Sequence, residues 1–176
     1  MQLNNLQIML YLIGFMGVGK TTIGEQLAAK HNVNFFDTDK EIEKITNNSI
    51  SDIFQKDGGN HFRKLETVTL KTITENNIVA CGGGLPVYNN NMNLIKKSGV
   101  SIYLKASEDE IFIRLSNNSE NRPLIQKKSD EDLRDFIKET LGKREKFYAM
   151  ADYTIDTSNL SEKDVLRKIN SLSLSI

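Results

Sequence analysis

The sequence has little that would tie the chain to an oxidising compartment, a membrane or a polyanion. Cys81 is the only cysteine, so no disulfide can form within the chain and a reducing compartment fits best. No apolar run reaches the roughly 18 to 20 residues that a membrane-spanning helix needs. Lysine plus arginine and aspartate plus glutamate both number 23, so the net charge is zero. This balance indicates neither a nucleic-acid partner nor a membrane partner, and we expect a cytoplasmic protein.

Internal repeats and long linkers are also missing. A length of 176 residues predicts one domain, spanning residues 1–176, with a substantial core. Hydrophobic residues make up 39% and charged residues 26%, values typical of a soluble globular protein. His31 and His61 share no metal-like spacing with each other or with Cys81, so we assign them no function.

What the sequence does contain is a phosphate-binding motif near its start. Residues 14–21, Gly-Phe-Met-Gly-Val-Gly-Lys-Thr, match the P-loop pattern G-x-x-x-x-G-K-[ST] at every fixed position. The apolar run 8–13 before it predicts a buried strand, and Ile23 and Leu27 after it lie four apart, as on one face of a helix. A chance match would lack this context. We therefore expect backbone N–H groups here to bind phosphate, with Lys20 on the β- and γ-phosphates and Thr21 on Mg²⁺.

Further short strands are predicted at residues 33–36, 77–81, 100–104 and 153–155, with helices between them. Strands that alternate with helices predict a parallel sheet covered on both faces. Ligands bind such sheets beyond the carboxyl ends of the strands. Three strands end in the P-loop, in residues 37–39 and in residues 82–84, so these three loops are expected to open at the same edge.

The other candidate site residues each allow two interpretations. Asp37 and Asp39 are interpreted either as a magnesium-linked carboxylate and a group facing a substrate hydroxyl, or as a helix N-cap. Three consecutive glycines allow close backbone approach to a ligand or form a plain turn. Arg63 and Glu66, three apart on a helix, are by default a solvated surface pair, and Arg144 by default faces water. The polar segment 117–129 with Arg122 is interpreted as a closing lid or as a long loop.

Taken in order, these motifs resemble the shikimate kinase family over nearly the whole chain. The specific part is the set that follows the P-loop: Phe36-Asp37-Thr38-Asp39, Asp52-Ile53-Phe54, Phe62-Arg63 with Glu66, Gly82-Gly83-Gly84, Asn121-Arg122-Pro123-Leu124, and Lys143-Arg144 before Tyr148. The resemblance implies an α/β fold of three layers (α/β/α), a nucleoside-monophosphate-kinase-like P-loop kinase. It implies a five-stranded parallel sheet of order 2-3-1-4-5, a substrate-binding helical segment at about 38–66 and a lid at about 117–129.

The same resemblance implies an activity and assigns residues to it. The γ-phosphate of ATP passes to the 3-hydroxyl of shikimate, in the synthesis of aromatic precursors, with Mg²⁺ present. The implied nucleotide-binding residues are Gly17, Val18, Gly19, Lys20, Thr21, Thr22, Arg114 and Arg122. The implied shikimate-binding residues are Asp39, Arg63, Gly82, Gly83, Gly84 and Arg144, and the metal is assigned to Thr21 and Asp37. Lys20, Asp39 and Arg122 are the implied catalytic residues, and we expect a monomer.

Three positions depart from the family pattern, and rival functions stay open. Cys81 stands where Thr or Ser is common, Gly59 replaces a usual acidic residue, and residues 145–148 replace a Pro-Leu-Tyr ending. The nearest rival is a kinase of the same fold that phosphorylates gluconate or a nucleoside monophosphate. A nucleotide-binding regulatory module without turnover is a second. A nucleic-acid-binding ATPase is disfavoured by the neutral charge.

Overall fold

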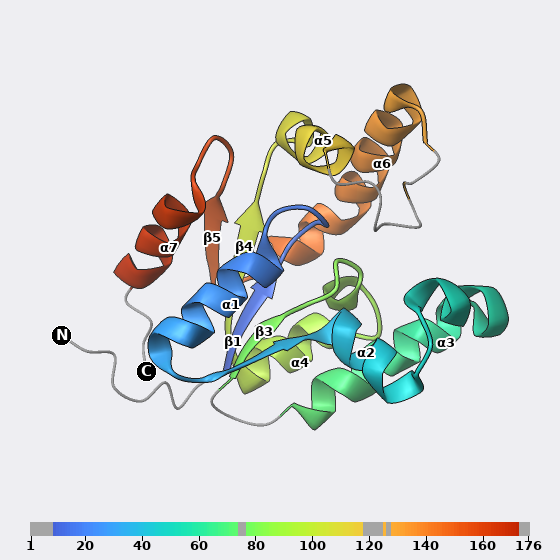
Figure 1. Cartoon of the computed structure of the whole chain (residues 1–176). Helices are drawn as coiled ribbons and strands as arrows, with labels where there is room; N and C mark the ends of the chain where they lie inside the picture. The colour runs from blue at the N-terminus through green and yellow to red at the C-terminus, as the bar shows by residue number, and fades with distance from the viewer. Residues whose placement is uncertain (1–8, 74–76, 118–124, 126–127, 173–176) are drawn as a thin grey trace.

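The computed structural model describes residues 9–73, 77–117, 125 and 128–172 of the chain (Figure 1). In chain order the elements are β1 (Met9–Ile13), α1 (Lys20–His31), β2 (Asn34–Asp37), α2 (Thr38–Thr46), α3 (Ile50–Thr72), β3 (Asn77–Ala80), the 3₁₀ helix η1 (Leu85–Val87), α4 (Asn91–Ser98), β4 (Gly99–Lys105), α5 (Glu108–Ser116), α6 (Asp130–Tyr148), β5 (Tyr153–Asp156) and α7 (Glu162–Ser171). None of these helices is long and apolar enough to cross a membrane.

The five strands form one parallel sheet in the order β2-β3-β1-β4-β5. The strand order implied by the family resemblance is therefore confirmed. In the centre, Leu12 of β1 pairs with Ala80 of β3 and with Ile102 of β4. Because the strands are parallel, the loops that follow β1, β2 and β3 leave the sheet at the same edge.

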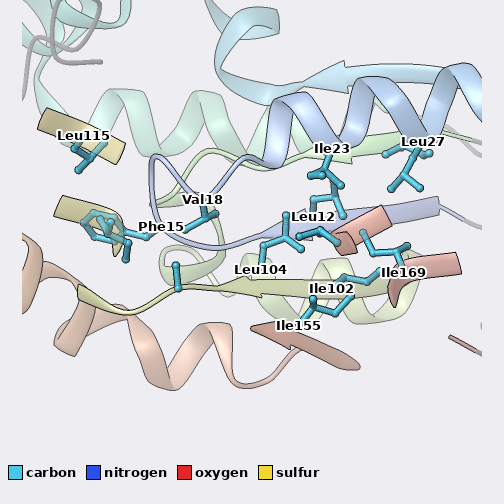
Figure 2. Packing of buried hydrophobic residues seen from close by; sticks show 14 of the residues in the cluster. Leu12, Phe15, Val18, Ile23, Leu27, Ile102, Leu104, Leu115, Ile155 and Ile169 are labelled. Carbon is cyan, nitrogen blue, oxygen red and sulfur yellow. The ribbon is translucent and has the colours of Figure 1, made fainter. Parts of the chain in front are cut away.

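The alternation of side chains along β1 divides the core between the two faces of the sheet. Leu10 and Leu12 belong to a cluster that includes Ile23 and Leu27 of α1 and Ile169 of α7 (Figure 2). The intervening residues of β1 belong to a second cluster, which contains residues of α3 and α4. Successive strand side chains point to opposite faces, so a strand buried on both sides reads as a continuous apolar run. Helices cover both faces and produce the three expected layers (Figure 1).

A third, smaller cluster joins α2 to α3 through Ile42, Ile53 and Phe62. α3 is bent at Gly58, whose φ of 77° and ψ of 167° are not helical. The sequence predicts two helices separated by glycines at this point, and the structure agrees except that the second helix continues directly from the first. The bend turns Phe62 back toward Phe54, with 4.8 Å between their ring centroids.

Ser107 and Ser129 are predicted from the sequence to cap the helices that follow them, and the structure confirms both caps. Ser107 Oγ accepts the N–H of Glu110, and Ser129 Oγ accepts the N–H of Asp132. The spacing of Ser107 and Glu110 also predicts a reciprocal capping box, and the return bond from Glu110 in that prediction is wrong. The Glu110 carboxylate turns away to accept from Arg114, and the Ser107 N–H instead donates to Ser158. The Ser107 hydroxyl keeps its half of the box, while the other half is replaced by an ion pair within α5 and by a tertiary contact from Ser158.

Candidate functional site

The P-loop links β1 to α1 and places a cation over its own backbone. Gly17 and Gly19 have φ angles of 84° and 92°, which an L side chain rarely adopts, so glycine is required at both positions. Lys20 Nζ donates to the carbonyls of Gly14 and Phe15, at 3.0 and 2.8 Å. Helix α1 begins at Lys20 without a side-chain cap on its first turn. The N–H groups of that turn therefore face the loop and favour an anion there.

Asp37 ends β2, and its two carboxylate oxygens perform different tasks. Oδ1 accepts the backbone N–H of Asp39 at 3.1 Å and that of Lys40 at 3.3 Å, which caps α2. Oδ2 accepts the hydroxyl of Thr21 at 2.7 Å. The two interpretations of this residue are therefore compatible, since one oxygen caps the helix while the other faces the P-loop. Two oxygen atoms suited to bind a metal ion, one from Thr21 and one from Asp37, therefore lie side by side.

Thr38 and Asp39 connect the end of β2 to the glycines after β3. Thr38 is fully buried, and its hydroxyl oxygen accepts the N–H of Gly82 at 2.8 Å. Asp39 lies against the same glycine. Burial, reinforced by the negative charge of Asp37, raises the pKa of Asp39 to about 6, although Lys20 and Arg63 oppose the shift. Above that pH the Asp39 carboxylate is ionised and can accept a hydrogen bond from a substrate hydroxyl.

Each of the three consecutive glycines leaves room for one charged side chain. A Cβ built on Gly82 would lie 3.0 Å from Asp39 Cγ, and one on Gly84 would lie 2.7 Å from Arg63 Cζ. A Cβ on Gly83 would lie 3.2 Å from Arg144 Nη1. A larger residue at these positions would crowd the neighbouring charged side chains, which explains why glycine stands there. Because the three glycines have no side chains, one carboxylate and two guanidinium groups can lie against the same stretch of backbone.

Arg63 and Glu66 form a buried pair, so the default interpretation of a solvated surface pair is wrong. Arg63 Nη1 donates to Glu66 Oε2 at 2.7 Å, and their side chains are 17% and 1% exposed. Burial raises the pKa of Glu66 to about 7, although Arg63 lowers it by charge and by hydrogen bonding. Glu66 Oε1 has no partner within the described part of the chain. A one-turn spacing cannot distinguish this buried pair from an exposed one.

The raised pKa of Glu66 predicts a specific dependence of stability on pH. An acid that binds its proton more tightly when folded stabilises the fold at low pH, and that contribution is lost as pH rises from about 4.5 to about 7. Relative to Glu66→Gln, the wild type is expected to lose free energy of unfolding, on the order of 3 kcal/mol, across this window. Urea unfolding of both proteins at several pH values measures the difference. Parallel curves for the two proteins would contradict the raised pKa.

Arg144 lies near the end of α6 beside a buried tyrosine. Its Cζ is 5.9 Å from the centroid of the Phe15 ring, in the P-loop. One turn on, Tyr148 is fully buried and donates its hydroxyl to the carbonyl of Gly83 at 2.6 Å. Burial raises the pKa of Tyr148 to about 12, with the Arg144 guanidinium opposing the shift. The phenol therefore stays a donor and holds the glycine loop against α6.

Beside the P-loop lies a cavity of about 750 Å³. Part of its wall comes from residues that belong to no sequence motif. Its walls are Gly17, Val18, Gly19, Lys20, Thr21, Thr22, Ile23, Glu110, Arg114, Thr157, Leu160, Ser161, Glu162 and Val165. Arg114 is one of these wall residues, and its role in nucleotide binding stays a prediction. It donates to the carbonyl of Thr157 at 3.0 Å and to Glu110 at 2.8 Å, and so joins α5 to the loop after β5.

Of the remaining residues named from the sequence, Cys81 is described by the structure and Arg122 is not. Cys81 is 1% exposed and belongs to the apolar cluster with Tyr103 and Tyr148, and burial raises the pKa of its thiol. It is a packed neutral thiol. Arg122 and most of the segment 117–129 lie outside the described residues. No set of three or more His, Cys, Asp or Glu side chains that could hold a metal is found in the described ranges.

The geometry brings together a phosphate-binding loop, a carboxylate and two guanidinium groups at one edge of the sheet. The P-loop lies next to both the cavity and the three glycines: residues 17–21 line the cavity, and a Cβ built on Gly83 would lie 3.6 Å from Gly14 and Met16. An acceptor with both a carboxylate and a hydroxyl would match the two arginines and Asp39. The arrangement is therefore able to place such a hydroxyl near the terminal phosphate of a bound nucleotide.

Comparisons with known proteins agree with this geometry. A family model described as shikimate kinase matches residues 16–173. The shikimate kinase of Thermodesulfovibrio yellowstonii is 44% identical over 160 residues, covering 90% of each chain. Among solved structures, shikimate kinase from Acinetobacter baumannii in complex with shikimate has a TM-score of 0.87 and 35% identity, covering 97% of this chain and 94% of that one. The shikimate kinase structure from Bacteroides thetaiotaomicron also has a TM-score of 0.87, with 32% identity, covering 93% of this chain and 96% of that one.

These matches cover about nine tenths or more of both partners, and the family model spans most of the P-loop, the acidic end of β2 and the three glycines after β3. They favour shikimate over gluconate or a nucleoside monophosphate, and turnover over a regulatory role. The chain belongs to the shikimate kinase family, whose members are ATP-dependent phosphotransferases.

Proposed function

We propose that this chain transfers the γ-phosphate of ATP to the 3-hydroxyl of shikimate through the residues that converge on Gly82, Gly83 and Gly84. The observation that carries this assignment is the set of three close approaches, by Asp39, by Arg144 and by Arg63. Shikimate offers a carboxylate for two guanidinium forks and hydroxyls for one carboxylate. Charge-assisted bidentate pairs give both affinity and orientation, and Asp39 then selects the hydroxyl that faces the nucleotide.

We further propose that ATP occupies the cavity beside the P-loop. Residues 17–22 would hold the phosphates through backbone N–H groups and Lys20, as the start of α1 favours. Arg114 and the loop from Thr157 to Glu162 would then border the base and ribose. Arg122, from the segment that the resemblance interprets as a lid, would add positive charge at the transferring group. One chain supplies both substrate pockets, which supports a monomeric single-domain enzyme, and the use of ATP fits the cytoplasm.

The pair formed by Thr21 and Asp37 fits a divalent cation. Mg²⁺ prefers oxygen ligands and commonly takes only one or two from the protein, with phosphates and water completing its shell. Thr21 Oγ1 and Asp37 Oδ2 lie 2.7 Å apart beside the phosphate loop, so Thr21 would bind the ion directly and Asp37 would support it through water. When bound there, the cation would neutralise charge on the β- and γ-phosphates.

Within this site the protein's main contributions are position and charge. Phosphoryl transfer passes through a loose transition state, so in-line placement of the hydroxyl counts for more than a strong base. Lys20 stabilises the negative charge on the phosphates. Asp39, with a pKa of about 6, is ionised at neutral pH. It orients the attacking hydroxyl by accepting a hydrogen bond from it. The buried Glu66 holds Arg63 in place.

A coupled ADP-release assay with Mg-ATP, in the presence and absence of shikimate, tests this function. Shikimate-dependent release is expected, and Asp39→Asn should lower kcat by about 100-fold or more because the amide cannot accept and orient the hydroxyl as a carboxylate does. Asp57→Asn, an exposed change on α3, is the matched control and should leave the rate unchanged.

Release with gluconate or a nucleoside monophosphate, and none with shikimate, would overturn the substrate assignment. Undiminished turnover of Asp39→Asn would remove that carboxylate from the mechanism. Excess chelator should abolish the rate, and a rate that persists without divalent cation would exclude the proposed role of Thr21 and Asp37.

A further inference from the structure

The guanidinium of Arg63 is surrounded by aromatic rings as well as by Glu66. Its Cζ lies 5.8 Å from the ring centroid of Phe54, 5.2 Å from that of Phe62 and 4.4 Å from that of Tyr88. Phe62 comes from the same helix and is 4% exposed, so its place is explained by the cluster between α2 and α3. Tyr88 has no such explanation, and it is the closest of the three.

Tyr88 directly follows η1 and is 43% exposed, which is unusual for so large an aromatic side chain. It belongs to none of the three apolar clusters described above. Burial of apolar surface therefore does not account for its position. The contact that the structure gives it is the face of its ring against the Arg63 guanidinium.

The chain around Tyr88 is fixed on both sides. Asn89 Nδ2 donates to the carbonyl of Arg63 at 2.9 Å and to Thr67 Oγ1 at 3.0 Å, which ties the segment to α3. Asn89 and Asn90 both have positive φ, 51° and 60°, a conformation that asparagine tolerates better than most residues. Asn91 is fully buried and donates to the carbonyl of Leu85 at 3.0 Å. Tyr88 is therefore carried on a rigid turn that is anchored to the backbone of the arginine it covers.

Stacking and carboxylate binding use different parts of a guanidinium. A ring attracts the cation through its face, whereas the five N–H donors point outward in the guanidinium plane. Arg63 can therefore keep its contact with Tyr88, donate to Glu66 and still direct N–H groups at a ligand. A side chain held in this way loses less rotamer freedom when the ligand arrives.

We propose that Tyr88 is a positioning residue for shikimate, which acts by stacking on Arg63 and holding its guanidinium plane toward the substrate carboxylate. This inference rests on the carboxylate-binding role of Arg63 proposed above. Tyr88 itself contacts neither the reacting hydroxyl nor the phosphates. Its effect is on the affinity for shikimate and is absent from the affinity for ATP.

The test compares Tyr88→Phe with Tyr88→Leu in steady-state kinetics. The phenylalanine variant keeps the ring and should keep the KM for shikimate within about twofold, whereas the leucine variant should raise it about tenfold. The KM for ATP and kcat at saturating shikimate should stay unchanged in both. Because Tyr88 is exposed, both variants should keep the melting temperature of the parent, which shows that the fold is intact.

A double-mutant cycle with Arg63→Ala separates this inference from the role of Arg63 itself. Arg63→Ala should raise the KM for shikimate, and adding Tyr88→Leu to it should change that KM by less than about twofold, because the stacked group is already gone. Full additivity, or an equal loss in Tyr88→Phe and Tyr88→Leu, would overturn the positioning role. A normal KM in Arg63→Ala would instead overturn the carboxylate-binding role on which it rests.

Discussion

Lys20→Ala is expected to lower kcat by about a thousandfold while leaving the fold intact. Lys20 Nζ lies across the P-loop, where it donates to the carbonyls of Gly14 and Phe15. A bound nucleotide would draw this ammonium onto its phosphates, where charge grows as the γ-phosphoryl leaves. Loss of a charge aimed at the transition state lowers kcat more than it weakens ground-state binding. Coupled ADP release at saturating shikimate and ATP gives kcat.

Lys30→Ala is the matched control for that experiment. Lys30 lies in the last turn of the same helix, exposed and away from the loop, so its loss removes a lysine without touching the phosphates. Its kcat should equal that of the parent, and thermal melting of both variants should show intact folds. Near-normal turnover of Lys20→Ala would remove the P-loop lysine from the mechanism.

Arg144→Ala is expected to weaken shikimate binding by about 100-fold and to leave ATP binding unchanged. The Arg144 guanidinium lies against Gly83 and over the Phe15 ring. Apart from Arg63, it is the cation that the proposed site offers to a substrate carboxylate. Truncating it leaves the substrate carboxylate with Arg63 alone. Titration calorimetry with each substrate separately measures the two affinities.

Two further variants define what Arg144 contributes. Arg144→Lys keeps the charge but loses the planar fork, so its affinity should fall between those of the parent and Arg144→Ala. Lys143→Ala removes the adjacent, 77% exposed charge and should bind both substrates normally. Equal losses of shikimate and ATP affinity in Arg144→Ala would contradict a substrate-specific role.

The sequence was sufficient for the parts of the site that depend on local pattern. A buried strand, a glycine loop and a helix with Ile23 and Leu27 on one face determine the P-loop without tertiary information. The N-cap interpretation of Asp37 is confirmed by one of its oxygens, while the metal-linked interpretation stays a prediction for the oxygen that accepts from Thr21. Where the residues of a motif are close together in the sequence, their types and spacing are enough to predict its local structure.

The parts that could not be predicted depend on contacts between distant segments. Glu66 looked like half of an exposed pair, but its burial is set by the packing of α3 against the rest of the site. Thr157 and Val165 line the cavity beside the P-loop only because β5 lies at one edge of the sheet, beyond β4. No motif marks these residues. Arg114 was predicted to be a nucleotide-binding residue by resemblance alone, and its hydrogen bond to Thr157, 43 positions away, could not be predicted from local pattern.

The three glycines after β3 have a consequence for how this protein can change over time. They carry no side chain, yet Asp39 and Arg63 occupy the space that a methyl group at Gly82 or Gly84 would need, and Arg144 lies in tight contact with the place of one at Gly83. An inherited change to alanine at any of them would displace a charged group from the pocket, although the backbone angles themselves would permit it. The mutational tolerance of this stretch is thus set by its neighbours, so selection on the charged residues also preserves the glycines.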